Sequence, residues 1–139
     1  MDWDLCKKKF VREVEQDKEQ LASLLETSDS RFNFLSKQEV TKNNVSFIIE
    51  GYYEVVKELL IALLLKNGMR SRNHQCLISF FYNKYPNYEA ETHLISNLNY
   101  LRNRLNYYGE KIDIEYYEKN KSEIKNTIKI LKKLFLKPL

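Results

Sequence analysis

The chain has 139 residues, a length that predicts one folded domain with a buried core of its own. Its 23 basic and 19 acidic residues give a formal net charge of +4, which permits a nucleic-acid or nucleotide partner without requiring one. With only three glycines and two prolines, the composition favours an all-α fold over a fold built from many tight turns.

Targeting and redox signals predict an intracellular protein. The longest apolar run without a charge, 59–65, has seven residues, whereas roughly 20 are needed to span a bilayer. The stretch from Asp2 to Lys9 is charged, unlike a secretory signal peptide. Cys6 and Cys76 lie far apart and have no metal-ligating companions, so we expect two reduced thiols. We therefore expect a cytoplasmic protein with no cofactor, no metal and no membrane attachment.

The N-terminal part of the chain predicts one long helix. Apolar residues follow a helical stripe from Phe10 to Leu35, so we expect the helix to continue to about Ser36. The run 27–30 has poor helix propensity and marks the place where this helix can kink. Residues 37–44 are polar and predict the first loop.

The second predicted helix runs from about Val45 to Asn67, with Asn43 or Asn44 as its cap and Gly68 as its end. It is apolar on most sides and carries only a narrow charged strip. Such a helix belongs at the centre of a bundle, or faces both a bundle and a second subunit. We therefore expect it to anchor the fold, and we expect a homodimer.

The rest of the chain completes an up-down bundle of about five helices. It predicts a basic loop and three further helices, namely the loop 69–73, helices over 74–85 and 90–108, and a last helix that begins at Asp113. Pro86 ends the third helix, and Gly109 ends the fourth because glycine readily adopts the left-handed conformation.

The fourth predicted helix carries an unusual polar pattern. Its leucines form one helical face, made of Leu94, Leu98, Leu101 and Leu105. Beside that face three amides surround one arginine, in the set Asn99, Arg102, Asn103 and Asn106. Amides donate and accept hydrogen bonds in fixed directions, and arginine presents a planar fork that suits phosphate. The same pattern also fits a helix end whose arginine caps carbonyls or pairs with a carboxylate.

Three blocks of sequence extend this pattern into a family resemblance. They are EGYYEVVKELLIALLLKNG (50–68), RNHQCLISFF (72–81) and LRNRLNYYG (101–109). With their spacing they cover over half of the chain, which from Phe47 onward resembles the HEPN family (higher eukaryotes and prokaryotes nucleotide-binding), particularly its small stand-alone prokaryotic members. The third block matches the first half of the family's Arg-polar-x(3–5)-His motif, in Arg102 and Asn103.

The second half of the motif differs, because Tyr107, Tyr108 or Gly109 stands where the family has histidine. In active members the resemblance implies a metal-independent cut at the RNA 2′-hydroxyl, in a cleft shared by two subunits. The motif arginine steadies the phosphate and the histidine moves a proton. Tyrosine, with an ordinary pKa of about 10, replaces histidine poorly in proton transfer, but it can stack on a base or donate to phosphate.

Three interpretations follow. The first is a homodimeric HEPN-like protein that binds a nucleotide or RNA through Arg102, Asn99, Asn103 and Asn106, with Arg102 near the surface or the subunit cleft. The second is a metal-independent endoribonuclease of the toxin type, partnered with a small nucleotidyltransferase, in which Arg102 works with His74, Tyr107 or Tyr108. The third is a non-catalytic helical dimerisation module whose amides join helices.

Overall fold

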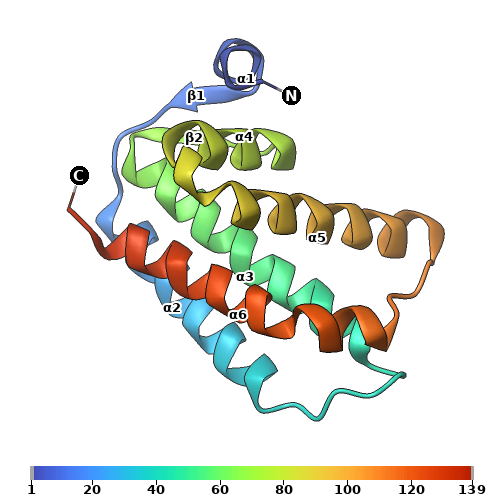
Figure 1. Cartoon of the computed structure of the whole chain (residues 1–139). Helices are drawn as coiled ribbons and strands as arrows, with labels where there is room; N and C mark the ends of the chain where they lie inside the picture. Colours follow the sequence, from blue (N-terminus) through green and yellow to red (C-terminus); the bar gives the residue numbers. More distant parts are fainter. Residues whose placement is uncertain (1, 139) are drawn as a thin grey trace.

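The structure is a computed structural model that describes residues 2–138 (Figure 1). These residues form six α-helices, one short 3₁₀ helix and a two-stranded sheet, so the predicted all-α bundle is confirmed in its main feature. In chain order the elements are α1 (Trp3–Lys9), β1 (Val11–Glu13), α2 (Lys18–Ser36), α3 (Val45–Lys66), β2 (Met69–Ser71), α4 (His74–Lys84), η1 (Pro86–Tyr88), α5 (Glu89–Tyr108) and α6 (Ile114–Leu136).

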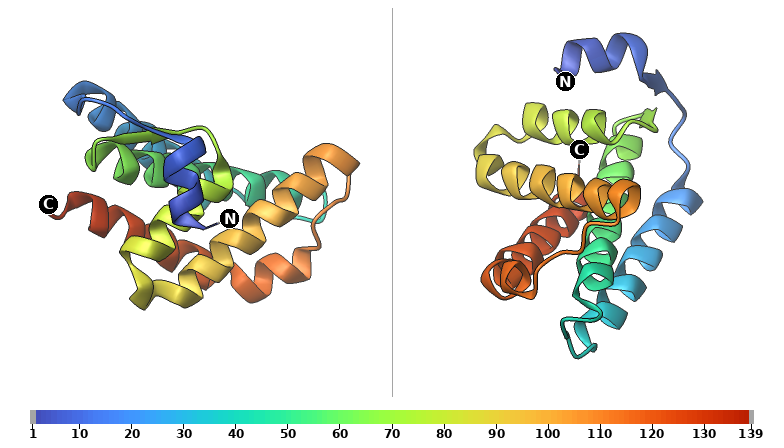
Figure 2. Two further views of the ribbon diagram at one scale, coloured as in Figure 1. Left: turned by 90° about the horizontal axis from the view of Figure 1, so that it is seen from above. Right: turned by 90° about the vertical axis from the view of Figure 1, so that its right-hand side faces the viewer.

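Helix α3 forms the centre of the bundle, as its apolar sequence predicted. It contacts α2, α4, α5 and α6 (Figures 1 and 2). Side chains on nearly all of its sides are buried, and burial of each large apolar side chain is worth about 1.5–3 kcal/mol. The other helices of the same chain provide most of this cover, although Phe47 at the start of α3 stays 65% exposed. The apolarity of α3 therefore does not by itself require a second subunit.

The prediction of one long first helix is wrong. The chain leaves α1 at Phe10, forms β1, and enters α2 only at Lys18. Asp17 begins α2, because its Oδ1 atom accepts hydrogen bonds of 3.1 Å from two backbone amides of the first turn. The weak helix formers at 27–30 leave α2 unbroken. The apolar stripe continues across the true break, and this continuity concealed it.

Part of the predicted basic loop is a strand. Strand β2 pairs antiparallel with β1, with Arg12 opposite Arg70 at the middle of the register. Gly68, at a φ of +77°, makes the turn into β2. This pairing brings the N-terminal segment back over the start of α4, so that α1 lies beside α4 at one end of the molecule (Figure 2).

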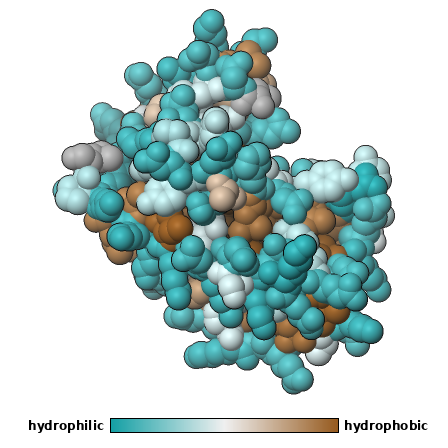
Figure 3. Space-filling view, viewed as in Figure 1, coloured by the Kyte–Doolittle hydropathy of each residue, from teal (hydrophilic) through white to brown (hydrophobic). Residues whose placement is uncertain are grey.

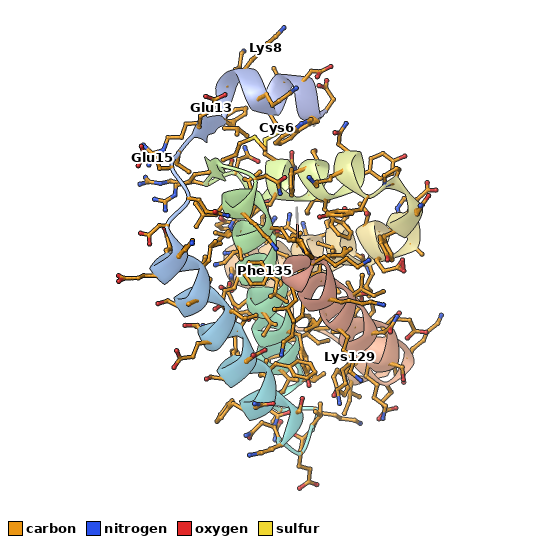
Figure 4. All side chains as sticks on the ribbon, turned by 90° about the vertical axis from the view of Figure 1, so that its left-hand side faces the viewer. Cys6, Lys8, Glu13, Glu15, Lys129 and Phe135 are labelled. Atoms are coloured by element: carbon orange, nitrogen blue, oxygen red, sulfur yellow. A yellow bond between two sulfur atoms is a disulfide. The ribbon has the colours of Figure 1, made fainter. Side chains whose placement is uncertain are left out.

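A disulfide joins α1 to α4, so the prediction of two reduced thiols is wrong. Cys6 and Cys76 are both fully buried, and their Cα atoms lie 5.6 Å apart. Cys6 projects from the side of α1 that faces α4, whereas Lys8 points away into solvent (Figure 4). Separation by 70 residues hid this proximity, which the pairing of β1 with β2 creates. The disulfide fixes the first turns of α4.

Most predicted helix ends are found where the capping signals placed them. Asp113 caps α6 and Gly109 ends α5 at a φ of +67°, both as predicted, and Asn73 caps α4. Asn44 is the exception, because its Oδ1 accepts from the amide of Thr41 in the preceding loop and leaves α3 uncapped. Within residues 2–138, no helix is both long and apolar enough to cross a bilayer.

Candidate functional site

Helix α5 turns part of its polar stripe towards the interior. Its most buried positions include an amide, in the set Thr92, Ile95, Leu98 and Asn99. Leu94, Leu101 and Leu105 are only half-buried. On the side of α5 that carries these leucines, Asn97 donates to the hydroxyl of Tyr116 in α6. Hydrophobic residues are visible between the two helices (Figure 3). The stripe is therefore not an ordinary solvent-facing surface.

Arg102 lies half-buried against α3. Its Cζ atom is 5.8 Å from the centre of the Tyr53 ring, and its Nη1 donates a 3.0 Å hydrogen bond to Oδ1 of Asn103. Its Nε is buried without a hydrogen-bond partner in the described part of the chain. No carboxylate of residues 2–138 forms an ion pair with this guanidinium. The positive charge is thus partly desolvated and locally uncompensated.

His74 joins Arg102 through the same tyrosine. The hydroxyl of Tyr53 lies 2.8 Å from Nδ1 of His74, and the two rings are stacked with their centres 5.8 Å apart. Asn73 places His74 in the first turn of α4, and the disulfide at Cys76 holds that turn against α1. The structure therefore brings together Arg102 and His74, two of the predicted site residues.

Burial and charge set the protonation of this pair. Burial lowers the pKa of His74, and the positive charges of Arg102 and Lys57 lower it further, while Glu54 opposes them. Burial also raises the pKa of the Tyr53 phenol well above its ordinary value. His74 is therefore neutral near pH 7, with Nδ1 engaged by a protonated hydroxyl. Because a hydroxyl both donates and accepts, either tautomer is possible, and Nε2 can donate or accept a proton.

The surrounding charges favour an anion at this place. Glu54 and Lys57 form an ion pair of 2.5 Å on one turn of α3, so that they neutralise each other. We name these five residues the Arg102 cluster, which consists of Tyr53, Glu54, Lys57, His74 and Arg102. Because His74 is neutral, Arg102 carries the net positive charge of the cluster. The cluster can hold an anionic group and place it near an imidazole that exchanges protons.

The tyrosines at the motif histidine position do not belong to this cluster. Tyr107 and Tyr108 lie largely exposed at the end of α5, more than one helical turn beyond Arg102. Tyr108 instead stacks with Arg104, whose Cζ is 4.4 Å from its ring centre, and Arg104 also pairs with Glu110. Asn106 is exposed on the same terminal turn.

The sequence does not predict a role in the site for Tyr53, Glu54 and Lys57, although all three lie in the first block of the family resemblance. A tyrosine inside an apolar helix is usually a core residue. The spacing of the three residues offered a signal, because positions 53, 54 and 57 lie on one side of a helix. That side faces His74 and Arg102, the groups with which the three residues interact.

A groove of about 490 Å³ adjoins the cluster between α4 and α5. Its polar and aromatic lining includes Tyr82, Thr92, Ser96, Asn99, Tyr100 and Asn103. Asn103 connects the groove to Arg102 through their hydrogen bond. Two more predicted residues, Asn99 and Asn103, thus lie next to the cluster, but in the wall of a separate hollow.

Neither metal-ligand geometry nor similarity identifies the site further. Within residues 2–138, no group of three or more His, Cys, Asp or Glu side chains is placed to hold a metal ion. Comparison of the chain with models of protein families, with curated proteins and with solved structures found no match in any of the three. The candidate site is therefore defined by its own geometry.

Proposed function

We propose that this chain binds a nucleotide or RNA by a phosphate group at Arg102. The observation that carries the proposal is the half-buried guanidinium, which has a buried Nε without an acceptor and no carboxylate partner among residues 2–138. A buried polar group left unpaired costs about 1–3 kcal/mol. A phosphate that accepts from the guanidinium would compensate its charge and match its forked geometry.

The contacts of the amides favour ligand binding over a purely structural stripe. Amides that join helices would form hydrogen bonds across them. Asn103 instead accepts from Arg102 on its own helix, and Oδ1 of Asn99 is buried without a partner in the described chain. The third interpretation, a non-catalytic dimerisation module, leaves these groups unexplained and predicts no binding of nucleotide or RNA.

A homodimer is part of the proposal. The half-buried leucines of α5 offer apolar surface beside the motif, and the HEPN resemblance implies that the motif helices of two subunits meet. Light scattering at micromolar concentration should return twice the mass of the chain. A monomer mass would remove the shared cleft while leaving the phosphate site of one subunit in place. That this chain has a small nucleotidyltransferase as a partner stays a prediction, which rests on the HEPN resemblance alone.

Two arginines of α5 allow a matched binding test. The probe is a fluorescein-labelled oligonucleotide of about ten 2′-O-methyl residues, a length suited to a single-strand site and resistant to cleavage at the 2′ position. Arg102→Ala should weaken binding by about tenfold or more, because hydrogen bonds to charged groups contribute about 1.5–3 kcal/mol. It should also reduce the dependence of log K on log salt by about one.

Arg104→Ala is the control, since it removes the same charge from a site already occupied by Glu110. It should change the affinity by no more than about twofold, because this guanidinium is already paired with a carboxylate at the edge of the molecule. Equal losses in the two variants would show that only the general positive charge matters. A wild-type protein that does not bind the probe would contradict the proposal.

A second candidate function is endoribonuclease activity, which the hydrogen bond between Tyr53 and His74 favours. Nε2 of a neutral His74 would take the proton of a 2′-hydroxyl, and the 2′-oxygen would form a bond to phosphorus. The bond from phosphorus to the 5′-oxygen would break, and that oxygen would take a proton from the imidazolium. Arg102 would steady the charge on the phosphate oxygens. The products would be a cyclic phosphate end and a 5′-hydroxyl end.

Analysis of RNA ends tests this second function. Purified protein is incubated with mixed RNA and a metal chelator, and the cut ends are identified by mass spectrometry. Cyclic phosphate ends should appear with the wild type and with His93→Gln, which removes an exposed histidine. They should disappear with Arg102→Ala and His74→Gln. Cleavage that persists in His74→Gln would exclude His74 as the proton carrier.

A further inference from the structure

Asn99 lies in the wall of the groove between α4 and α5, and its side-chain oxygen has no hydrogen-bond partner in the described chain. Only 7% of this residue is exposed, and its Oδ1 is buried without a partner in the described chain. The residue nevertheless lines the groove, whose volume of about 490 Å³ lies in the range of small-molecule sites. Buried side-chain oxygens nearly always have a partner, so a ligand that donates a hydrogen bond would account for this one.

Two tyrosines give the same groove aromatic surface. Tyr82 comes from α4 and Tyr100 from α5, and both are large, substantially exposed side chains that line the groove. Bases of single-stranded nucleic acids stack on such rings with little dependence on sequence. The groove therefore combines aromatic surface for stacking with a hydrogen-bond acceptor at Asn99, two features suited to a nucleobase.

The charges along the groove orient its ligand. At one end Asn103 bonds to Arg102, and at the other end Glu89 lies 3.7 Å from His93. A phosphate is attracted to the Arg102 end and repelled by the Glu89 carboxylate. Asn99 lies four residues, about 6 Å along the helix axis, from Asn103 towards the Glu89 end. The sugar of one nucleotide can bridge that distance between phosphate and base.

We infer that this groove is a base-binding subsite, in which the base stacks on Tyr100 or Tyr82 and donates an N–H group to Oδ1 of Asn99. The inference rests on the proposed function, because Arg102 supplies the neighbouring phosphate contact. Its ligand is a single-stranded nucleotide chain recognised by base as well as backbone. Inorganic phosphate or a sugar phosphate would occupy only the Arg102 end.

Three oligonucleotides of about ten 2′-O-methyl residues separate these contributions, and each competes with the labelled probe. The first carries adenine, the second carries purine, which lacks the amino group of adenine, and the third has no bases but keeps every phosphate. Adenine should bind about fivefold more tightly than purine, the value of a neutral hydrogen bond. The chain without bases should bind about tenfold more weakly than purine, because stacking is lost.

Variants assign each loss to a residue. Asn99→Leu should abolish the difference between adenine and purine, and it should fold normally because the lost oxygen has no partner in the described chain. Asn97→Leu, on the α6 side of the same helix, should keep that difference. Tyr100→Ala should reduce the difference in affinity between the purine oligonucleotide and the oligonucleotide without bases. Tyr107→Ala should leave that difference unchanged, because Tyr107 is exposed and lies outside the groove.

The outcomes separate this inference from the proposal on which it rests. If all three oligonucleotides bind equally and all depend on Arg102, the phosphate site stands and the base subsite is wrong. If the adenine and purine oligonucleotides bind equally, Asn99 does not accept a hydrogen bond from the base, and the proposed base subsite is rejected. If none of the three binds, the proposed function and the subsite are both rejected.

Discussion

Two arginines lie two residues apart on α5, and they differ in their hydrogen-bond partner, in their ion pairing and in the burial of the ring beside them. Arg104 is half-buried like Arg102, but it donates to the carboxylate of Glu110 and stacks on Tyr108 at the end of the helix. Arg102 lies in the C-terminal half of α5 over the buried ring of Tyr53, with no carboxylate partner among residues 2–138. The first guanidinium is already satisfied within the protein, whereas the second has capacity left for a ligand.

The aromatic partners of the two arginines explain part of the difference. Tyr53 is 1% exposed, whereas Tyr108 is largely in solvent. A cation over a ring is worth about 0.5–1 kcal/mol at an exposed site and about 2 kcal/mol or more where water is excluded. The position of an arginine relative to the core therefore decides its role more than its place in a sequence motif.

The largest expected effect concerns these two rings. Tyr53→Ala should lower the free energy of unfolding by about 3–5 kcal/mol, since it empties a buried aromatic site next to α4 and α5. Tyr108→Ala should stay within about ±0.5 kcal/mol, as is usual at the surface. Urea denaturation followed by circular dichroism measures both. Similar small losses would show that Tyr53 does not contribute to the core as the structure indicates.

A smaller effect concerns the pH dependence of stability. His74 has a lowered pKa in the folded state, because of its burial first and then because of Arg102 and Lys57. Below the ordinary value of 6.5 the unfolded state therefore binds the proton more readily than the folded state. The contribution of His74 to the free energy of unfolding should be fully present above about pH 6.5. It should be lost as the pH falls below 6.5 and through the lowered pKa of the folded state. The slope stays under the limit of about 1.4 kcal/mol per pH unit, because His74 is only half-buried.

Two histidine variants isolate that slope. His74→Gln should flatten the decline in the urea midpoint between about pH 7 and pH 5.5, in the region of the ordinary histidine pKa. His93→Gln should retain it, because the burial that produces the slope belongs to His74. An unchanged slope in His74→Gln would mean that other groups cause the decline.

The two arginines should also differ in their effect on His74 itself. Arg102→Ala should raise the pKa of His74 towards its ordinary value without reaching it, because burial is the largest cause of the lowering and remains. Arg104→Ala should leave the titration unchanged, since Arg104 does not contribute to the lowered pKa. NMR titration of the imidazole protons follows both variants. Equal shifts would contradict the contrast between the two positions.

The sequence predicted the helices of the bundle better than it predicted the contacts between distant segments. Local signals placed Gly109 at the end of α5 and Asp113 at the start of α6, because capping depends on neighbouring residues alone. The break before Asp17 was hidden by an apolar stripe that continues through non-helical residues. The disulfide depends on the pairing of β1 with β2, for which three-residue strands give almost no pattern.

The candidate site was predictable in the same partial way. Arg102 was identified because amides around one arginine are unusual on a helix surface. His74 was a candidate, but its partner Tyr53 lies 21 residues away on another helix, and no periodicity connects them. Tyr107 and Tyr108 were chosen by motif position, and the structure places them beyond the cluster. The polar pattern of one helix therefore indicated the arginine, while the tertiary fold determines which distant side chains lie beside it.

The smallest expected effect concerns the ion pair between Arg104 and Glu110 at the end of α5. The hydrogen bond from Arg104 lowers the pKa of Glu110, so any stability from the pair should be present at neutral pH and lost on acidification. Both side chains keep much of their surface in water, however, and ordering two long side chains offsets most of the attraction there. Glu110→Gln and wild type should therefore have the same urea midpoint at about 0.1 M salt. The two midpoints should also be equal at about 1 M salt, where the screening length falls from roughly 10 Å to 3 Å.

A lower urea midpoint of Glu110→Gln that returns to the wild-type value at high salt would contradict this prediction. It would show that the end of α5 stabilises the fold electrostatically. Arg104 would then be a structural residue, and only Arg102 would remain as the arginine of α5 available to a ligand.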